Sequence, residues 1–294
     1  MYPHIGLSRW CRLFGYSRQA FYQQIWSLSD KTMEEQLILK MVLSIRSEQP
    51  RIGVRKLYIM LEEQLHRSVI KIGRDALFDL LARENLLVKK RKRKYPHTTN
   101  STGWFKKYED LTIGFQPFQS NQMWVADITY ITVTTKFIYL SLLTDAYSHQ
   151  IVGWSLQETL VTDGPLDALR MALKICKPIT GLIHHSDRGA QYRSLEYVNL
   201  LQDYQIRISM TQSGDPRENP IAERVNGIIK NELLQDKEFT SSQQAFQQIA
   251  DVISIYNEKR PHASCQMLTP QKAGTMKGIL LKKWKSTKKY SMKN

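Results

Sequence analysis

The feature that most restricts the fold of this chain is a change of sequence pattern near residue 122. Runs of β-branched and aromatic residues, separated by short turns, predict three strands that pair as a meander, and these runs cover residues 122–134, 136–148 and 150–156. Helical periodicity then alternates with short apolar runs, the helices at 163–176 and 194–203 and the strands at 181–186 and 206–210. This order predicts an α/β fold, a mixed sheet with helices packed on it.

The first 88 residues predict helices instead. Residues 6–24 are typical of two short helices around Gly15, with Ser17 as the N-cap of the second. This pattern is typical of a helix-turn-helix, in which Arg18 and Gln19 would contact DNA bases, but ordinary helical hairpins have the same pattern. Amphipathic stretches within residues 33–87 predict a three-helix bundle after it.

Charge favours a polyanionic partner. The net charge is +15, and the surplus of Lys and Arg lies in residues 1–115 and 241–294, while residues 116–240 are slightly acidic. Such ends can grip phosphates on both sides of a carboxylate-bearing centre, although solvated lysines are the ordinary alternative. The most basic run is a candidate phosphate contact within a linker: Lys89, Lys90, Arg91, Lys92, Arg93 and Lys94.

The sequence does not favour a membrane protein, a disulfide-stabilised protein or a zinc-binding protein. No apolar stretch approaches the roughly 18 residues of a membrane span, so we expect a soluble cytoplasmic protein. The cysteines Cys11, Cys176 and Cys265 are far apart, which favours inert thiols over a disulfide framework or a zinc ribbon. His184 and His185 are adjacent on a predicted strand and point to opposite faces, so we expect packing roles for them.

Carboxylates mark the candidate site. Asp127 interrupts an apolar strand and Asp187 ends another, and a buried carboxylate needs a hydrogen bond, an arginine or a cation. After the loop at 214–218, Asn219 and Pro220 predict a helix start. Helical periodicity then gives that helix a polar face, which carries Glu223, Asn226, Gly227 and Lys230.

Convergence of the three acids would require a cation. Carboxylates brought together repel one another and take up protons unless a positive charge neutralises them. Oxygen ligands of this kind suit Mg²⁺ or Mn²⁺. Two such ions roughly 4 Å apart can activate a hydroxyl and stabilise the leaving oxygen of a phosphodiester.

The motifs, taken together, resemble the insertion-sequence-3 family of bacterial transposases. They are, in order, WVADITYI, LLTDAYSHQIVGW, HHSDRGAQY, SGDPRENPIAERVNGIIKNEL, YNEKRPH and LTPQKA. Asp187 and Glu223 are separated by 35 residues, and Lys230 follows Glu223 by seven, which resembles the family signature. The family pattern of Asp-Asn before this helix is Glu218 and Asn219 here.

The resemblance implies a ribonuclease-H-like catalytic core of the retroviral integrase superfamily with a DDE triad. It assigns catalysis and two Mg²⁺ or Mn²⁺ ions to Asp127, Asp187 and Glu223, and a DNA-end contact to Lys230. Asp145 falls in a motif that resembles a structural signature of the family. Further candidate DNA contacts are Arg188, Arg224, Asn226, Arg260 and His262.

The predicted organisation has five segments. They are a helix-turn-helix segment at 1–30, a three-helix domain at 31–88, a basic linker at 89–115, the catalytic core at 116–275 and a basic tail at 276–294. The implied function is binding of the inverted-repeat ends of an insertion sequence, with metal-dependent strand cleavage and strand transfer. A non-catalytic end-binding protein and a ribonuclease-H-like nuclease that hydrolyses without joining are the alternatives.

The implied partners follow from that function. They are double-stranded DNA, as element ends and target, and further copies of the chain, because joining two ends generally needs at least two subunits. The resemblance adds a helix-turn-helix protein from an upstream reading frame. A bacterial, nucleoid-associated location would follow, with no membrane.

Overall fold

The computed structural model describes residues 6–89, 108–134, 136–176, 180–213, 215–235, 237–281 and 283–284. The chain divides into two compact units, Met1–Ser47 with Gly53–Leu87, and Glu48–Ile52 with Val88–Asn294. Among the described residues, no helix combines the length and the apolar character that crossing a membrane requires.

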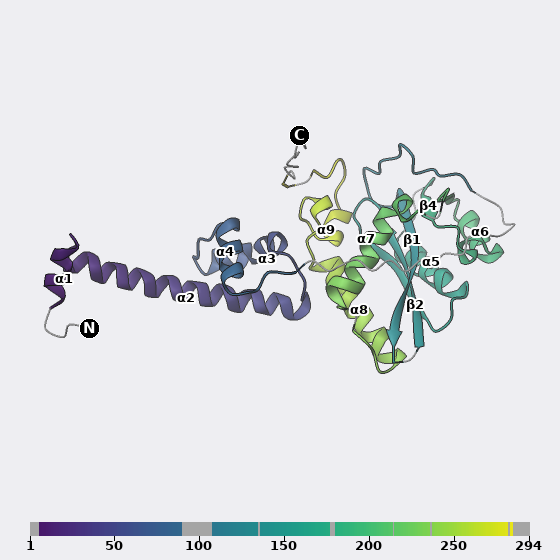
Figure 1. Ribbon diagram of the computed structural model, residues 1–294. Coiled ribbons are helices and arrows are strands. Elements are labelled where there is room, and N and C mark those ends of the chain that lie inside the picture. Colours follow the sequence, from purple (N-terminus) through teal and green to yellow (C-terminus); the bar gives the residue numbers. More distant parts are fainter. Residues whose placement is uncertain are drawn as a thin grey trace, which may run out of the picture. The chain divides into compact units, whose positions relative to one another are not determined.

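The first unit is helical (Figure 1). Its helices are α1 (Leu7–Leu13), α2 (Arg18–Glu48), α3 (Val54–Arg67) and α4 (Arg74–Arg83). Gly15 has a φ of +73° and ends α1: its N–H donates to Arg12 O at 3.3 Å, and the N–H of Tyr16 donates to Cys11 O at 2.8 Å. These two bonds form a Schellman motif, which favours glycine at the left-handed position.

Helix α2 differs from the expectation of a second short helix. Ser17 caps it as predicted, because its Oγ accepts from the N–H of Ala20 at 3.0 Å. The helix then runs for 31 residues, through the boundary predicted between residues 30 and 31. It contains no glycine or proline, and the first proline after its start is Pro50, so nothing in the sequence ends it earlier.

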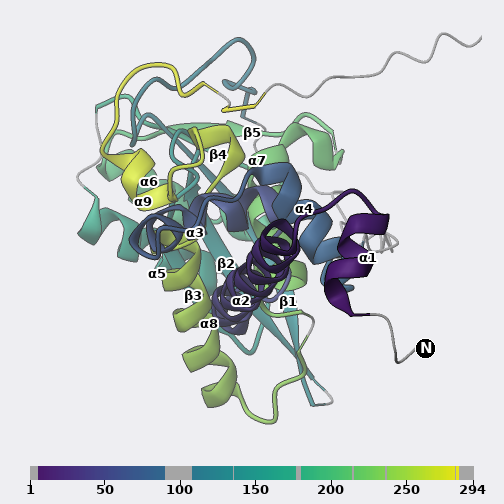
Figure 2. The same cartoon turned by 90° about the vertical axis from the view of Figure 1, so that its left-hand side faces the viewer.

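The bundle predicted for residues 33–87 has an apolar interior. Helices α3 and α4 pack against each other, and Figure 2 views them beside α2 almost along its axis. Arg83 and Glu35 form an ion pair of 2.5 Å between α4 and α2. The buried apolar side chains on the three helices are Ile38, Val42, Val54, Leu57, Leu61, Leu65, Leu77, Leu80 and Leu81.

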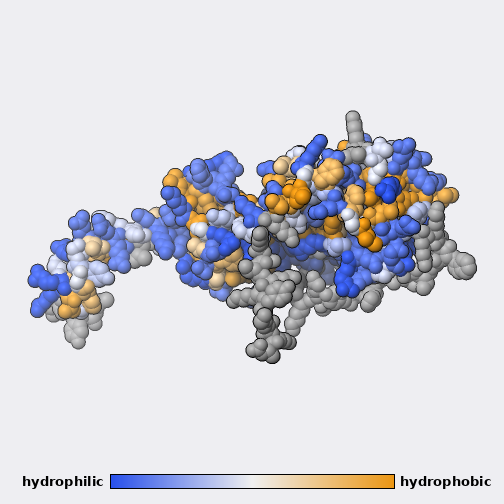
Figure 3. All heavy atoms as spheres, turned by 90° about the horizontal axis from the view of Figure 1, so that it is seen from above, coloured by the Kyte–Doolittle hydropathy of each residue, from blue (hydrophilic) through white to orange (hydrophobic). Residues whose placement is uncertain are grey.

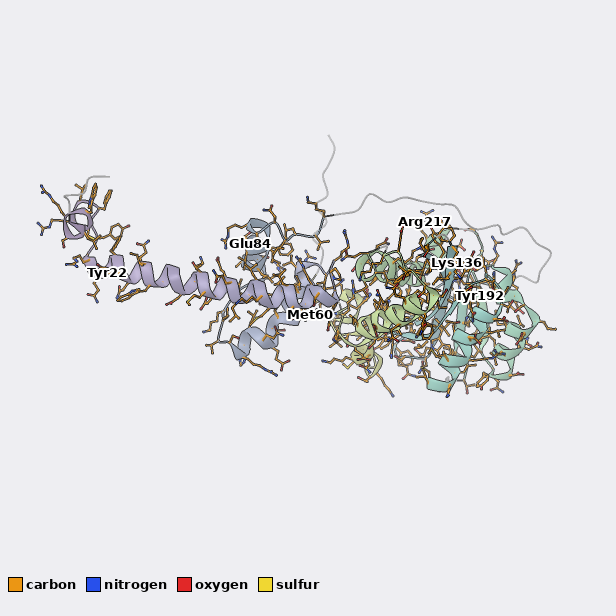
Figure 4. The ribbon with its side chains drawn as sticks, turned by 90° about the horizontal axis from the view of Figure 1, so that it is seen from below. Tyr22, Met60, Glu84, Lys136, Tyr192 and Arg217 are labelled. Atoms are coloured by element: carbon orange, nitrogen blue, oxygen red, sulfur yellow. The ribbon has the colours of Figure 1, made fainter. Side chains whose placement is uncertain are left out.

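Apolar side chains are also exposed at the N-terminal end of this unit. Leu13 and Phe14 are 72% and 66% exposed, and Trp26 is 64% exposed. In Figure 3, hydrophobic residues (orange) lie among hydrophilic ones (blue) on the surface of this unit. Figure 4 labels Tyr22 in the N-terminal part of α2.

The second unit is built on a mixed five-stranded sheet with strand order β3-β2-β1-β4-β5. Strands β1, β2 and β3 form the predicted antiparallel meander, while β4 and β5 run parallel to β1. This arrangement is that of a ribonuclease-H-like core. The strands are β1 (Met123–Val133), β2 (Lys136–Asp145), β3 (Ile151–Gln157), β4 (Ile183–Ser186) and β5 (Arg207–Met210).

Helices cover both faces of the sheet (Figure 1). The α-helices are α5 (Asp163–Ile175), α6 (Leu195–Asp203), α7 (Pro220–Ile228), α8 (Ser242–Glu258) and α9 (Pro270–Gly274). Short helices are η1 (Ala190–Arg193), η2 (Pro216–Glu218), the π-helix η3 (Ile229–Leu233) and η4 (Ala263–Cys265).

The alternation of side chains along β1 separates two cores. Trp124 and Ala126 pack with α5 and α6 on one face, while Ile131 and Val133 pack with α7, η3 and α8 on the other. Because successive side chains in a strand point to opposite faces, Asp127 lies on the α7 face.

Candidate active site

The register of β1 and β4 brings the first two acids level with each other. These parallel strands pair Trp124 with His184 and Val125 with His185. Two residues further along both chains, Asp127 on β1 is level with Asp187, which directly follows β4. Neighbouring strands lie about 4.8 Å apart, so these carboxylates are brought close by the backbone ladder itself.

Helix α7 brings the third acid to the same place. The side chain of Asn219 donates from Nδ2 to Ala126 O at 2.9 Å and so fixes the start of α7 beside Asp127. Two turns later, Asn226 Nδ2 donates to Asp127 Oδ2 at 2.6 Å. Glu223 lies between these two anchors, one turn before Asn226 on the same helical face.

The three carboxyl groups lie close enough for their charges to affect one another's pKa. Burial, together with the charges of Glu223 and Asp187, raises the pKa of Asp127 to about 8, against the hydrogen bonds from Asn226 and the Ile128 N–H. Burial also raises the pKa of Glu223, with Asp187 adding to the effect and Lys230 opposing it.

Asp187 has counter-charges of its own. Burial raises its pKa, while the N–H of Gly189, which donates to Asp187 Oδ1 at 2.9 Å, and the charges of Arg193 and Arg188 lower it. Arg193, at the end of η1, had no role in the sequence analysis. Its proximity to Asp187 depends on a short helix that periodicity does not reveal.

Lys230 lies beside this group, in the π-helix η3. Its Nζ is 3.8 Å from the centre of the Tyr130 ring on β1, a cation–π contact that holds the ammonium near Glu223. Tyr192 also lies near: its hydroxyl is buried without a hydrogen-bond partner among the described residues, and the charges of Asp187 and Asp127 act on it. Tyr192 is labelled in Figure 4.

Several predicted DNA contacts have other roles in the structure. Asn226 is 5% exposed and binds Asp127, so its amide faces the carboxylates and not the solvent. Arg260 is 1% exposed and pairs with Glu232, and His262 is 6% exposed. The burial of these three side chains could not be predicted from the sequence, because helical position alone does not tell whether another element covers a side chain.

The remaining candidates differ in their accessibility. Arg18, Gln19 and Lys89 are exposed, and Arg188 is half-buried. Arg224 is exposed and forms an ion pair of 3.0 Å with Glu232. The residues Lys90, Arg91, Lys92, Arg93 and Lys94 lie outside the described part of the chain.

The buried histidines of β4 have the packing roles that we expected. His184 Nε2 is 2.9 Å from the Tyr197 hydroxyl. His185 Nδ1 is 2.9 Å from Ser209 Oγ, and its Nε2 is 3.2 Å from Glu218 O. The second ring therefore links β4 to β5 and to the loop that leads into α7.

Asp145 has a structural role. Its Oδ1 accepts from the N–H of Asn121 at 2.8 Å, and its Oδ2 accepts from the N–H and the hydroxyl of Ser148 at 2.8 and 2.6 Å. These bonds occupy the carboxylate within the turn after β2.

Comparison with known proteins identifies the family. Two integrase core domain families match, one over residues 117–216 and the other over residues 204–270. The chain is 33% identical over 264 residues to an uncharacterized 31 kDa protein of insertion element IS600 from Shigella sonnei, covering 88% of this chain and 95% of that protein. It is 31% identical to the transposase for insertion sequence element IS629, also from Shigella sonnei, covering 71% of this chain and 68% of that protein.

Solved structures give weaker similarity. The catalytic core domain of HTLV-2 integrase, solved in complex with magnesium, matches with a TM-score of 0.45 and 18% identity, over 54% of this chain and 99% of that one. The sequence relatives decide the assignment. The chain belongs to the insertion-sequence-3 family of transposases, within the DDE integrase-like superfamily.

Proposed function

We propose that this transposase binds the inverted-repeat ends of its insertion sequence, cleaves the DNA strand there and joins the freed end to target DNA. Asp127, Asp187 and Glu223 form the catalytic group of this proposal. The observation that carries it is that these acids, which lie on a strand, at the end of a strand and on a helix, are close enough for their charges to shift one another's pKa.

The three carboxylates fit a site for Mg²⁺ or Mn²⁺. Without a cation their mutual repulsion and burial hold a proton on Asp127 up to a pH of about 8, and a divalent ion would replace that proton. Carboxylate oxygens are the ligands that these ions prefer. Two ions at such a site supply activation of an attacking hydroxyl and stabilisation of the leaving oxygen.

The other side chains would prepare the site and hold DNA. Asn226 orients the Asp127 carboxylate through its 2.6 Å hydrogen bond. Lys230, held over the Tyr130 ring, offers a positive charge beside Glu223 for a DNA phosphate. Arg188 and Arg193 offset the charge of Asp187 from the other side.

End recognition is assigned to the first unit. Its exposed Arg18 and Gln19 follow the capped start of α2. Lys89, at the start of the basic run, is exposed and belongs to the second unit. Cleavage and joining of two ends would proceed in an assembly of at least two copies of the chain. An upstream-frame helix-turn-helix protein would contribute further to end recognition.

The test is incubation of the purified chain with DNA carrying the ends of its own element, with Mg²⁺, followed by mapping of cut and joined strands. We expect both products from the wild-type chain, and neither from Asp127→Asn, Asp187→Asn or Glu223→Gln. Asp203→Asn is the matched control, because Asp203 is an exposed acid at the end of α6.

The outcomes separate the alternatives. Cut ends without joined product would indicate a nuclease, and end binding without any product would indicate a non-catalytic binding protein. Unchanged cleavage and joining by Asp127→Asn would overturn the assignment of the site.

A further inference from the structure

A second cluster of metal-ligating side chains lies apart from the carboxylates. His149, His262 and Cys265 each offer one ligand atom, and these atoms all lie within 4.8 Å of one another. His149 comes from the turn between β2 and β3, while His262 directly precedes η4 and Cys265 ends it, after α8. The cluster shares no residue with the catalytic group.

The backbone around this cluster is firmly held. The Tyr256 hydroxyl donates to His149 O at 2.9 Å, and the Asn257 side chain bonds to both the N–H and the carbonyl of Ile151 at 2.9 Å. The thiol of Cys265 lies 3.3 Å from Ser148 O. These contacts keep the two chain segments together, so the three ligands are brought together by elements fixed for other reasons.

His149 has one feature that packing alone does not explain. Its φ is +59°, a left-handed conformation in which histidine and asparagine are both enriched, so the backbone alone does not indicate a ligand. Its Nδ1 is buried without a hydrogen-bond partner among the described residues, whereas both ring nitrogens of His185 have partners. A buried polar atom without a partner is costly, and a metal ion is one means of satisfying it.

We propose that His149, His262 and Cys265 bind Zn²⁺ or a divalent cation with the same ligand preference. Two imidazole nitrogens and one thiolate suit Zn²⁺, and they do not suit Mg²⁺, which prefers oxygen ligands. Solvent would provide the fourth ligand on the side of His149, which is partly exposed, whereas His262 and Cys265 are buried. On binding, the Cys265 thiol releases its proton to solvent and no other covalent bond changes.

Binding requires a small local rearrangement. The rings of His149 and His262 are stacked, with centres 4.4 Å apart and planes at 13°. Lone pairs of parallel rings do not converge on one point, so one ring turns about its Cβ–Cγ bond as the ion enters. The bound ion would fasten the segment after α8 to the turn between β2 and β3, which is a structural role.

The test uses the full-length chain, freed of metal with a chelator and titrated with Co²⁺ as a spectroscopic substitute for Zn²⁺. We expect the visible absorption of tetrahedral Co²⁺ together with a sulfur-to-metal charge-transfer band. The catalytic carboxylates can also bind Co²⁺, but they contain no sulfur, so Asp127→Asn should leave the charge-transfer band in place.

Matched variants assign the ligands. Cys265→Ser should abolish the charge-transfer band, whereas Cys176→Ser, which alters a half-buried free thiol after α5, should retain it. His149→Asn should weaken Zn²⁺ binding at least about 10-fold, because asparagine accepts the left-handed backbone but offers no imidazole. His66→Asn, on the exposed side of α3, is its control.

Two measurements keep folding defects separate from metal binding. Native mass spectrometry of the wild-type chain with Zn²⁺ should show one added ion that persists in Asp127→Asn. Added Zn²⁺ should raise the melting temperature of the wild-type chain but not that of Cys265→Ser. Absence of the charge-transfer band in the wild-type chain, or its survival in Cys265→Ser, would overturn the proposal and leave the cluster as a stacked pair beside a thiol.

Discussion

The side chain of Asn226 on α7 donates a hydrogen bond of 2.6 Å to Asp127 on β1, a residue 99 positions earlier in the chain. This contact joins the helix that carries Glu223 to the strand that carries the first acid. The position of α7 and the orientation of the Asp127 carboxylate are therefore coupled.

Removal of this amide should impair catalysis more than stability. In Asn226→Ala the Asp127 carboxylate loses its orienting donor, so we expect strand joining to fall about 10- to 100-fold and more Mg²⁺ to be needed for half-maximal rate. The measurement is the rate of joining across a Mg²⁺ series. Asn199→Ala on the exposed part of α6 is the control, and equal Mg²⁺ dependence in both variants would contradict the prediction.

The pH dependence of stability should reveal Asp127. Folding raises its pKa from 3.8 to about 8, so between these values the folded state holds a proton that the unfolded state has released. The free energy of unfolding contributed by this group therefore falls as the pH rises from about 4 to about 8.

Asp127→Asn should remove that contribution. In chelator, the variant should melt above the wild-type chain at pH 8, and the difference should shrink towards pH 4. Thermal unfolding across this pH range measures the effect, with Asp203→Asn expected to follow the wild-type curve. Parallel curves for Asp127→Asn and the wild-type chain would show that the carboxyl is not buried against its neighbours.

The ion pair between Arg260 and Glu232 should matter for stability and not for DNA affinity. Glu232→Gln leaves the guanidinium of Arg260, which is 1% exposed, without its counter-charge, and we expect a loss of about 3–5 kcal/mol of unfolding free energy. Arg224→Gln removes the exposed partner of the same glutamate and should cost less than about 1 kcal/mol. Urea titration gives both values, and a smaller loss for Glu232→Gln than for Arg224→Gln would refute this view.

Replacement of glycine by alanine should have opposite effects on stability at Gly153 and at Gly227. A Cβ at Gly153 on β3 would lie 2.0 Å from the carbonyl oxygen of Ala168 on α5, so Gly153→Ala should destabilise the chain by about 1–3 kcal/mol or more. At Gly227, inside α7, the nearest atom would be 3.9 Å away. Gly227→Ala should therefore stabilise the helix by about 0.5–1 kcal/mol, and both shifts can be read from melting temperatures.

Much of the second unit could be predicted from the sequence, because its patterns are local. The period of two in β1 and the proline at the start of α7 depend on neighbouring residues, so the meander and the face carrying Glu223 were predictable. Asn219 is at the predicted N-cap position, but its side chain bonds to Ala126 O on β1 and does not cap the helix. The predicted capping of α2 by Ser17 is confirmed by its hydrogen bond to Ala20.

Burial and partners that depend on distant elements could not be predicted. The polar face of α7 was predictable, but not the hydrogen bond from Asn226 on that face to Asp127 on β1. The sequence alone gives no sign of a partner for Arg260, but in the structure η3 places Glu232 beside it, and the two form an ion pair. The His149, His262 and Cys265 cluster escaped notice because its members are split between two segments far apart in sequence, which no ligand-spacing rule covers.

The shared ladder of β1 and β4 also limits how the catalytic group can change shape. Two of its acids lie two residues beyond the last pair of that ladder, Val125 with His185, so the ladder restricts how far they can move apart. Adjustment to a bound phosphodiester then falls to the exposed side chain of Glu223, because Asn219 and Asn226 hold α7 itself against β1. If the proposed metal site is correct, engineering of its metal preference should accordingly begin with Glu223 and leave the strands unchanged.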